Sequence, residues 1–403
     1  MKSIREIYKI GQGPSSSHTM GPVKAAKIYL ENHPDAKEFV VTLYGSLAAT
    51  GKGHLTDKAI YDVLIERGPV TILWEPKTFL PEHPNAVSFT FVAEDGSRQD
   101  EWIFYSVGGG DIRCDKVPFV ESEDIYPLNK MTDLMKWCNE NGRSYWEYVD
   151  QYEDPSIWEY LEKVWDTMCK AIENGLENEG VLPGGLKVAR RAGNHYVRAL
   201  GYKNAMRSRG LVFSYSLAVS EENAAGGTIV TAPTCGSCGV VPSVLYHLHK
   251  EHEFSRKRII RSLATAALVG NVVKANASIS GAEVGCQGEV GVACAMAAAA
   301  ATQLFGGSPA QIEYAAEMAL EHHLGLTCDP ICGLVQIPCI ERNAMAAARA
   351  LDANVYASYT DGLHRVSFDQ VVKVMKKTGK DLPSLYKETS EGGLATVVDS
   401  CNL

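Results

Sequence analysis

The sequence predicts an α+β N-terminal domain followed by a mainly α-helical C-terminal domain. Over residues 1–115, short runs of β-branched and aromatic residues alternate with turn residues, a pattern typical of strands. From about residue 175 onward, apolar residues recur at helical spacing among many small residues, which favours closely packed helices. The chain has 403 residues, enough for two or three domains that each bury a core.

The N-terminal domain is predicted to span residues 1–150. Its strands are expected at residues 39–44, 70–74, 87–92 and 102–105, and its helices at about 21–32 and 56–67. Residues 120–172 are polar and rich in tryptophan, with helical spacing and little glycine or serine. We therefore predict a helical connector here rather than a flexible linker.

The C-terminal domain is predicted to span residues 151–403. Helical periodicity predicts helices at residues 256–276, 290–305, 309–324, 341–351 and 368–377. Segments rich in glycine and proline separate several of these helices, and those segments hold most of the cysteines. This arrangement predicts a compact bundle with thiols in its loops.

The composition narrows the class of protein. The net charge is −9 and no basic stripe is present, so a nucleic-acid partner is not expected. No run of about 18 apolar residues occurs, so no membrane span is expected. The first residues lack the apolar segment of a secretion signal, which predicts a cytoplasmic location. An odd count of 11 cysteines in such a chain argues against a disulfide framework.

Three of the cysteines are candidate metal ligands. Cys286, Cys328 and Cys339 each have glycine or proline within two residues, and each lies near polar side chains. Thiolates supplied by separate loops suit a soft metal centre, and three of them would leave one iron open as a Lewis acid. Buried free cysteines are the alternative. Cys235 and Cys238 have C-x-x-C spacing, which fits a redox pair, a structural role or a tight turn.

Two polar segments are candidate substrate contacts. Ser15, Ser16, Ser17 and Thr19 cluster with His18 just before a predicted helix, where free N–H groups bind anions such as carboxylates. An ordinary helix cap is the alternative. His54 lies in a Gly-Lys-Gly turn, where a histidine is either a surface residue or a group for proton transfer.

Several long motifs occur in one order along the chain. They are G-P-S-S-S-H-T-M-G-P at 13–22, T-G-K-G-H at 50–54, Y-S-V-G-G-G at 105–110, E-E-N-A-A-G-G at 221–227, T-A-P-T at 231–234, N-A-S-I-S-G-A-E-V-G-C at 276–286, L-G-L-T-C-D-P at 324–330 and I-P-C-I-E-R-N at 337–343. With these motifs the chain resembles the single-chain iron–sulfur L-serine dehydratases (L-serine ammonia-lyases) almost from end to end.

The resemblance implies an enzyme that eliminates water from L-serine to give pyruvate and ammonia. It implies a 4Fe–4S cluster held by Cys286, Cys328 and Cys339, with Cys401 near the C-terminus as a ligand of the open iron when substrate is absent. It also implies a homodimer. By this resemblance, catalysis is assigned to His54 and His18. Substrate binding is assigned to Ser15, Ser16, Ser17, Thr19, Asn276 and Ser278.

The chain departs from the family pattern at two positions. Cys235 stands where many members carry asparagine, and Thr90 stands where some carry histidine. The first departure concerns a segment near the substrate, so it bears on fine specificity. The second means that a role assigned to that histidine does not transfer to this chain.

Other functions fit parts of the same pattern. An L-cysteine desulfidase or an L-threonine-preferring dehydratase would use a similar cluster, although the N-terminal serine-rich motif argues against the desulfidase. An iron–sulfur redox sensor would use Cys235 and Cys238 and have no lyase activity. A small-anion binding module would need no iron. A pyridoxal-phosphate enzyme is disfavoured, because candidate lysines such as Lys274 lack the flanking pattern of that class.

Overall fold

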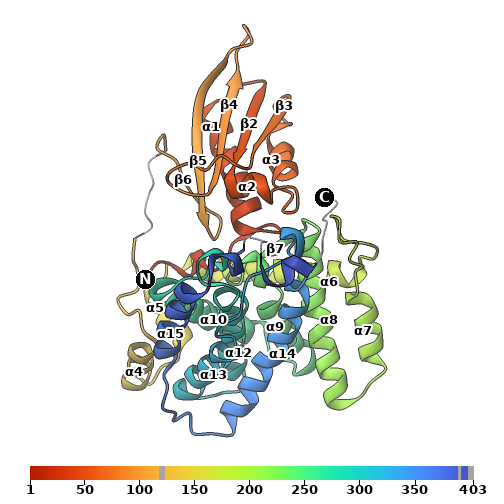
Figure 1. The fold of residues 1–403 in the computed structure, drawn as a ribbon. Coiled ribbons are helices and arrows are strands. Elements are labelled where there is room, and N and C mark those ends of the chain that lie inside the picture. Colours follow the sequence, from red (N-terminus) through yellow and green to blue (C-terminus); the bar gives the residue numbers. More distant parts are fainter. Residues whose placement is uncertain (118–122, 389–391, 398–403) are drawn as a thin grey trace.

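The computed structural model describes residues 1–117, 123–388 and 392–397, and it divides into a small sheet domain that stands on a larger helical body (Figure 1). The predicted fold class, α+β followed by mainly α-helical, is confirmed. Within the described ranges, no helix is long and apolar enough to cross a membrane.

The sheet domain contains five strands in the order β3-β2-β4-β5-β6. Their bounds are β2 (Phe39–Tyr44), β3 (Val70–Glu75), β4 (Asn85–Val92), β5 (Arg98–Gly108) and β6 (Asp111–Arg113). Strand β2 runs parallel to β3, and the other pairs are antiparallel. Helices α1 (Gly21–Asn32) and α3 (Thr56–Leu64) pack on the sheet, and the short α2 (Gly45–Ala49) follows β2. Alternate residues Phe39, Val41 and Leu43 are fully buried, as expected for a strand with one covered face.

The first residues of the chain belong to the helical body. Ile4, Ile7 and Tyr8 are fully buried in its core, which η1 (Ile4–Glu6) enters. Strand β1 (Ile10–Gln12) then pairs antiparallel with β7 (Thr228–Val230) of the body. The chain therefore crosses into the sheet domain immediately after β1, through η2 (Ser16–Met20), and this crossing places the serine-rich motif at the junction of the two domains.

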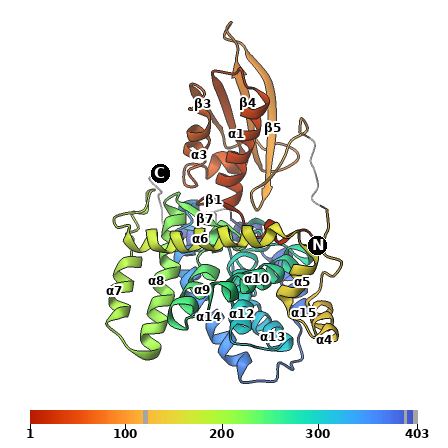
Figure 2. The ribbon, with the colours of Figure 1, turned by 180° about the vertical axis from the view of Figure 1, so that it is seen from behind.

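The helical body is built from long helices around a continuous apolar core. Its helices are α4 (Met131–Asn141), α5 (Tyr145–Tyr152), α6 (Ser156–Glu177), α7 (Ala192–Leu200), α8 (Asn204–Ala224), α9 (Val240–Glu251), α10 (Arg256–Asn276), α11 (Gly281–Val284), α12 (Val292–Leu304), α13 (Pro309–Glu321), α14 (Cys339–Ser358) and α15 (Phe368–Asp381). Its short turns are η3 (Cys235–Ser237), η4 (Gln287–Gly291), η5 (Ile331–Gly333), η6 (Ser384–Tyr386) and η7 (Gly393–Val397). Helix α12 is almost entirely buried, and its alanines let α10, α13 and α14 approach closely. Figure 2 shows α6 crossing the body beside β7.

The predicted elements agree with the structure where periodicity was strong. The predictions at residues 21–32, 39–44 and 256–276 coincide with α1, β2 and α10. The connector is helical over α4, α5 and the start of α6. The domain boundary at residue 150 stays a prediction, although α4 lies before it, α5 spans it, and both helices pack in the larger core.

Candidate active site

A small cavity at the junction of the domains gathers hydroxyls, an imidazole, carboxylates and thiols. The residues that line it are Pro14, Ser15, Ser16, Ser17, His54, Gly109, Thr234, Gly236, Ser280, Gly281, Glu289, Cys328, Pro330, Val335, Cys339 and Glu388. The sheet domain and its entry segment supply the serine-rich turn and the imidazole, and the helical body supplies the thiols, the carboxylates and the hydroxyls of Thr234 and Ser280. The cavity is complete only when both domains are in place.

The serine-rich turn is fixed by its own capping bonds. Ser15 is extended and caps η2, so its Oγ accepts a hydrogen bond from the His18 backbone N–H at 3.1 Å. Just before it, Asn223 of α8 donates to the Pro14 carbonyl at 3.1 Å. Thr19 is 1% exposed and donates to the His54 carbonyl at 2.8 Å, so it joins this turn to the histidine loop and does not line the cavity.

The two histidines of the site are buried and lie against each other, with ring centroids 4.4 Å apart. The Nδ1 and Nε2 atoms of His18 lie 3.1 Å and 3.2 Å from the hydroxyls of Ser17 and Ser46. The Nδ1 atom of His54 lies 3.1 Å from the Thr50 carbonyl. A carbonyl oxygen only accepts, so Nδ1 of His54 carries the hydrogen and its Nε2 keeps a free lone pair.

Burial keeps both rings neutral near pH 7. It lowers the pKa of His54 to about 4. Burial, followed by the proximity of His54, lowers the pKa of His18 well below its usual value. His54 is therefore a buried, unprotonated imidazole and not an exposed loop histidine.

The three candidate ligand cysteines come from three separate segments and converge. Cys286 follows α11, Cys328 lies in the loop after α13, and Cys339 begins α14. Cys286 lies beside Cys328 and, together with burial, raises the pKa of the Cys328 thiol, and Cys328 and Cys339 both line the cavity. Despite its burial, the Arg342 guanidinium has a raised pKa because Cys286 and Cys339 are close to it, so a fixed cation lies near the sulfur atoms. Cys401 lies outside the described residues.

Two carboxylates of the site were not among the predicted site residues. Glu289, one turn after Cys286, accepts a hydrogen bond from Thr234 Oγ1 at 2.8 Å and another from Cys328 Sγ at 3.7 Å. Burial raises its pKa. Its position three residues after Cys286 could have identified it from the sequence as a neighbour of that thiol. Glu388 has no such signal, because it reaches the cavity only through long-range pairing of its backbone with Cys328.

The comparisons with known proteins agree with this geometry. The family model described as "Serine dehydratase alpha chain" matches residues 83–395, and the model described as "Serine dehydratase beta chain" matches residues 3–75. The chain belongs to the serine dehydratase family. Similar full-length relatives are named L-serine dehydratase in Haemophilus influenzae (41% identical, 100% of both chains) and in Streptomyces coelicolor (40%, 99% of both). L-serine dehydratase TdcG of Escherichia coli is 42% identical over 99% of both chains.

In this member of the serine dehydratase family, two predicted substrate-binding residues lie outside the cavity. Asn276 ends α10, and its amide donates to the carbonyls of Asn129 and Val272 at 2.6 and 2.8 Å. The hydroxyl of Ser278 accepts from the backbone N–H of Ser280 at 3.1 Å. Their segment nevertheless reaches the cavity, because Ser280 and the following glycine line it.

The C-x-x-C pair lies next to the dehydratase cavity without lining it. Cys235 and Cys238 are buried free thiols at η3. The Sγ atom of Cys235 lies 3.9 Å from Met20 Sδ. Burial raises the pKa of Cys235 to about 12. A protonated thiol in this position packs against the serine-rich turn and is a poor redox nucleophile.

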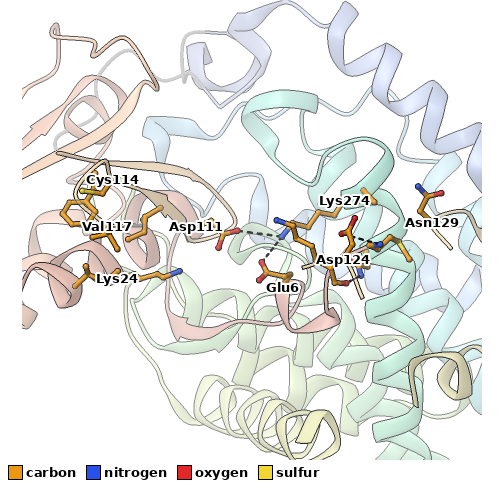
Figure 3. A pocket seen from close by; sticks show the side chains of 15 residues that line it. Glu6, Lys24, Asp111, Cys114, Val117, Asp124, Asn129 and Lys274 are labelled. Atoms are coloured by element: carbon orange, nitrogen blue, oxygen red, sulfur yellow. Dashed lines mark hydrogen bonds and ion pairs between the residues drawn. The ribbon is translucent and has the colours of Figure 1, made fainter. Parts of the chain in front are cut away.

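A second cavity, of about 550 Å³, lies beside the same domain junction (Figure 3). Lys274 of α10 lies in it 3.2 Å from Glu6 and 3.9 Å from Asp111 of the sheet domain, and Asp111 also pairs with Lys9 at 2.6 Å. These ion pairs tie the sheet domain to the helical body. The second cavity lacks the histidine, the hydroxyl cluster and the convergent thiols, so it is not the candidate active site.

Proposed function

We propose that this chain is an L-serine ammonia-lyase that converts L-serine to pyruvate and ammonia with a 4Fe–4S cluster held by Cys286, Cys328 and Cys339. The observation that carries the proposal is the convergence of these thiols on a cavity that also holds the serine-rich turn and the free Nε2 side of a neutral His54. The family and the names of its full-length relatives support the same reaction.

The donor set fits an iron–sulfur cluster. Three thiols are the soft ligands that such clusters use. Burial raises the pKa of Cys339, and the nearby Arg342 guanidinium partly offsets that rise. When bound, a cluster with one open iron supplies a Lewis acid that polarises the bond between the substrate carbon and its hydroxyl. Cys401 remains the proposed ligand of that iron when substrate is absent.

The chain's own residues would bind substrate and move its protons. The hydroxyls of Ser15 and Ser17, at the start of η2, would receive the substrate carboxylate. The Nε2 atom of His54 would take the α-proton, a role for which its low pKa keeps it unprotonated. His18 would hold the Ser17 and Ser46 hydroxyls in place. Loss of the α-proton and the β-hydroxyl gives 2-aminoacrylate, which tautomerises to the imine and hydrolyses to pyruvate and ammonia.

L-Threonine and L-cysteine remain the competing substrates. An L-cysteine desulfidase is less well supported, because the relatives that match the whole chain, including its N-terminal domain, are named L-serine dehydratase. The proposal also keeps a homodimer and a cytoplasmic location.

Anaerobic purification tests the function directly. The protein should contain about four irons per chain and form pyruvate and ammonia from L-serine in equal amounts. Parallel assays with L-threonine and L-cysteine measure 2-oxobutanoate and sulfide. Iron-loaded protein that releases sulfide from L-cysteine but no pyruvate from L-serine would identify the desulfidase instead, and iron-loaded protein inactive on all three would favour the redox sensor.

A further inference from the structure

We infer that Glu388 binds the α-ammonium group of the amino-acid substrate, an inference that rests on the proposed function. L-Serine carries three groups that a specific site must recognise: a carboxylate, a hydroxyl and an ammonium. The serine-rich turn suits the first and an open metal position suits the second. An ammonium has three donors and no acceptor, so its partner must be an acceptor and preferably an anion.

The backbone around Glu388 is held against a cluster-ligand loop. The Cys328 N–H donates to the Tyr386 carbonyl at 2.8 Å, and the Glu388 N–H donates to the Cys328 carbonyl at 2.7 Å. Glu388 also has φ of +61°, a left-handed conformation that few residues with a side chain adopt. Such a conformation persists only where the surrounding structure imposes it, and here it directs a carboxylate into the cavity.

The side chain of Glu388 faces the two imidazoles across a short gap. One carboxylate oxygen of Glu388 and one ring nitrogen each of His18 and His54 all lie within 4.8 Å of one another. Within the described part of the chain, neither ring is hydrogen-bonded to this carboxylate. An amino group bound to Glu388 would therefore lie next to the base that takes the α-proton.

The other acid of the cavity is already engaged. Glu289 accepts hydrogen bonds from Thr234 and from the thiol of Cys328, which holds it on the thiol side. Arg342 donates to the Thr327 carbonyl and to Asp329. Among the described lysines and arginines, none forms an ion pair with Glu388. Burial, followed by the proximity of Glu289, raises the pKa of Glu388 to about 8, and a bound substrate ammonium would supply the positive charge that this side chain lacks.

The test compares two ligands that differ only in the amino group. L-Serine and 3-hydroxypropanoate share the carboxylate and the hydroxyl, and the second lacks the ammonium. In anaerobically prepared Glu388→Gln, the KM for L-serine and its Kd by calorimetry should rise by at least about 10-fold. The Kd of 3-hydroxypropanoate should stay within about two-fold. Glu253→Gln is the matched control, since Glu253 is exposed and also has a positive φ, of +53°.

The outcomes separate this role from others. Equal weakening of both ligands, or no weakening of L-serine, would overturn the inference. A residue that only positions His54 would lower kcat and shift the pH profile without discriminating between the ligands. If Glu388→Gln does not fold, Glu388→Asp keeps the charge and shortens the reach, and the same selective loss is expected. If the wild-type chain binds L-serine without forming pyruvate, the proposed function fails while the binding comparison still decides this inference.

Discussion

Arg342 of helix α14 lies 3.1 Å from Asp329, in the loop that carries Cys328, and both side chains are largely buried. The same guanidinium donates to the Thr327 carbonyl at 2.6 Å. The segment that begins with Cys339 is thereby tied to the segment that presents Cys328. The distance between two proposed cluster ligands thus depends on an ion pair that binds no metal itself.

Arg342→Met should weaken the contact between the start of α14 and the loop that carries Cys328. Removing one partner leaves the Asp329 carboxylate buried and unpaired, which costs about 3 kcal/mol. We expect a lower Tm and fewer irons per chain after anaerobic purification. Arg209→Met, which breaks an exposed ion pair with Asp352, should change the unfolding free energy by less than about 1 kcal/mol. Comparable iron content in the two variants would argue that the Arg342–Asp329 ion pair does not position the cluster ligands.

Cys286→Ser, Cys328→Ser and Cys339→Ser should each lose most of the bound iron. Serine is a harder ligand than cysteine and does not replace a cluster thiolate well. Iron and sulfide content, together with the visible absorbance of the cluster, measure the loss. Cys294→Ala tests a buried thiol that bonds the Ala346 carbonyl away from the cavity, and it should keep its iron. Retention of iron in a Cys339→Ser protein would remove that residue from the ligand set.

His54→Ala should keep the cluster and lose activity. A positioned base contributes about 10²–10⁴-fold to proton transfer, so kcat should fall by that range. The absorbance of the cluster should match the wild type, because His54 is not among the thiols. His322→Ala, at an exposed position, is the control. Wild-type turnover in His54→Ala would assign the α-proton to another group.

Ser15→Ala should weaken substrate binding more than it slows the chemical step. The substitution removes a proposed donor to the carboxylate, and it also removes the cap of η2, worth about 1 kcal/mol. We expect a KM increase of about 10-fold at a nearly unchanged kcat. A lower kcat at unchanged KM would place Ser15 in the chemical step instead.

Acid should destabilise the fold through buried neutral histidines. Burial lowers the pKa of His247 to about 4, and its Nε2 lies 2.8 Å from Ser208. Below pH about 6.5 the unfolded chain binds a proton that the folded ring does not, so the unfolding free energy falls as pH drops from about 6.5 towards 4.

The contribution of His247 approaches about 1.4 kcal/mol per pH unit within that window. Denaturation by urea at several pH values should show a shallower dependence for His247→Gln than for the wild type. The exposed His252→Gln variant should retain the wild-type slope. Parallel curves for wild type and His247→Gln would contradict the prediction.

Periodicity predicted the elements that have one buried face and one exposed face. Helix α1 and strand β2 were predicted at their observed bounds. Helix α8 was not predicted as a separate element, because its C-terminal half is buried on every side. The buried residues there include Ser214, Ser216 and Ser220, so apolar and polar positions do not alternate at helical spacing.

The residues of the candidate active site were likewise predicted only in part. Sequence motifs predicted the three cysteines, His54 and the serine-rich turn, all of which lie in segments rich in glycine or proline. They also predicted Asn276 and Ser278, whose side chains hydrogen-bond to backbone groups outside the cavity. Glu388 could not be predicted as a site residue from the sequence, because only the fold brings the segment after α15 next to Cys328.

The antiparallel pairing of β1 with β7 joins the part of the chain that matches the beta-chain model to the part that matches the alpha-chain model. The two parts therefore depend on each other for a complete fold. If the polypeptide were divided between the sheet domain and the rest, the larger fragment would lose the partner of β7 and the side chains of Ile4, Ile7 and Tyr8 that fill its interior. Each fragment would then expose surface that only the other can cover, so reassembly of the halves would have to precede any turnover.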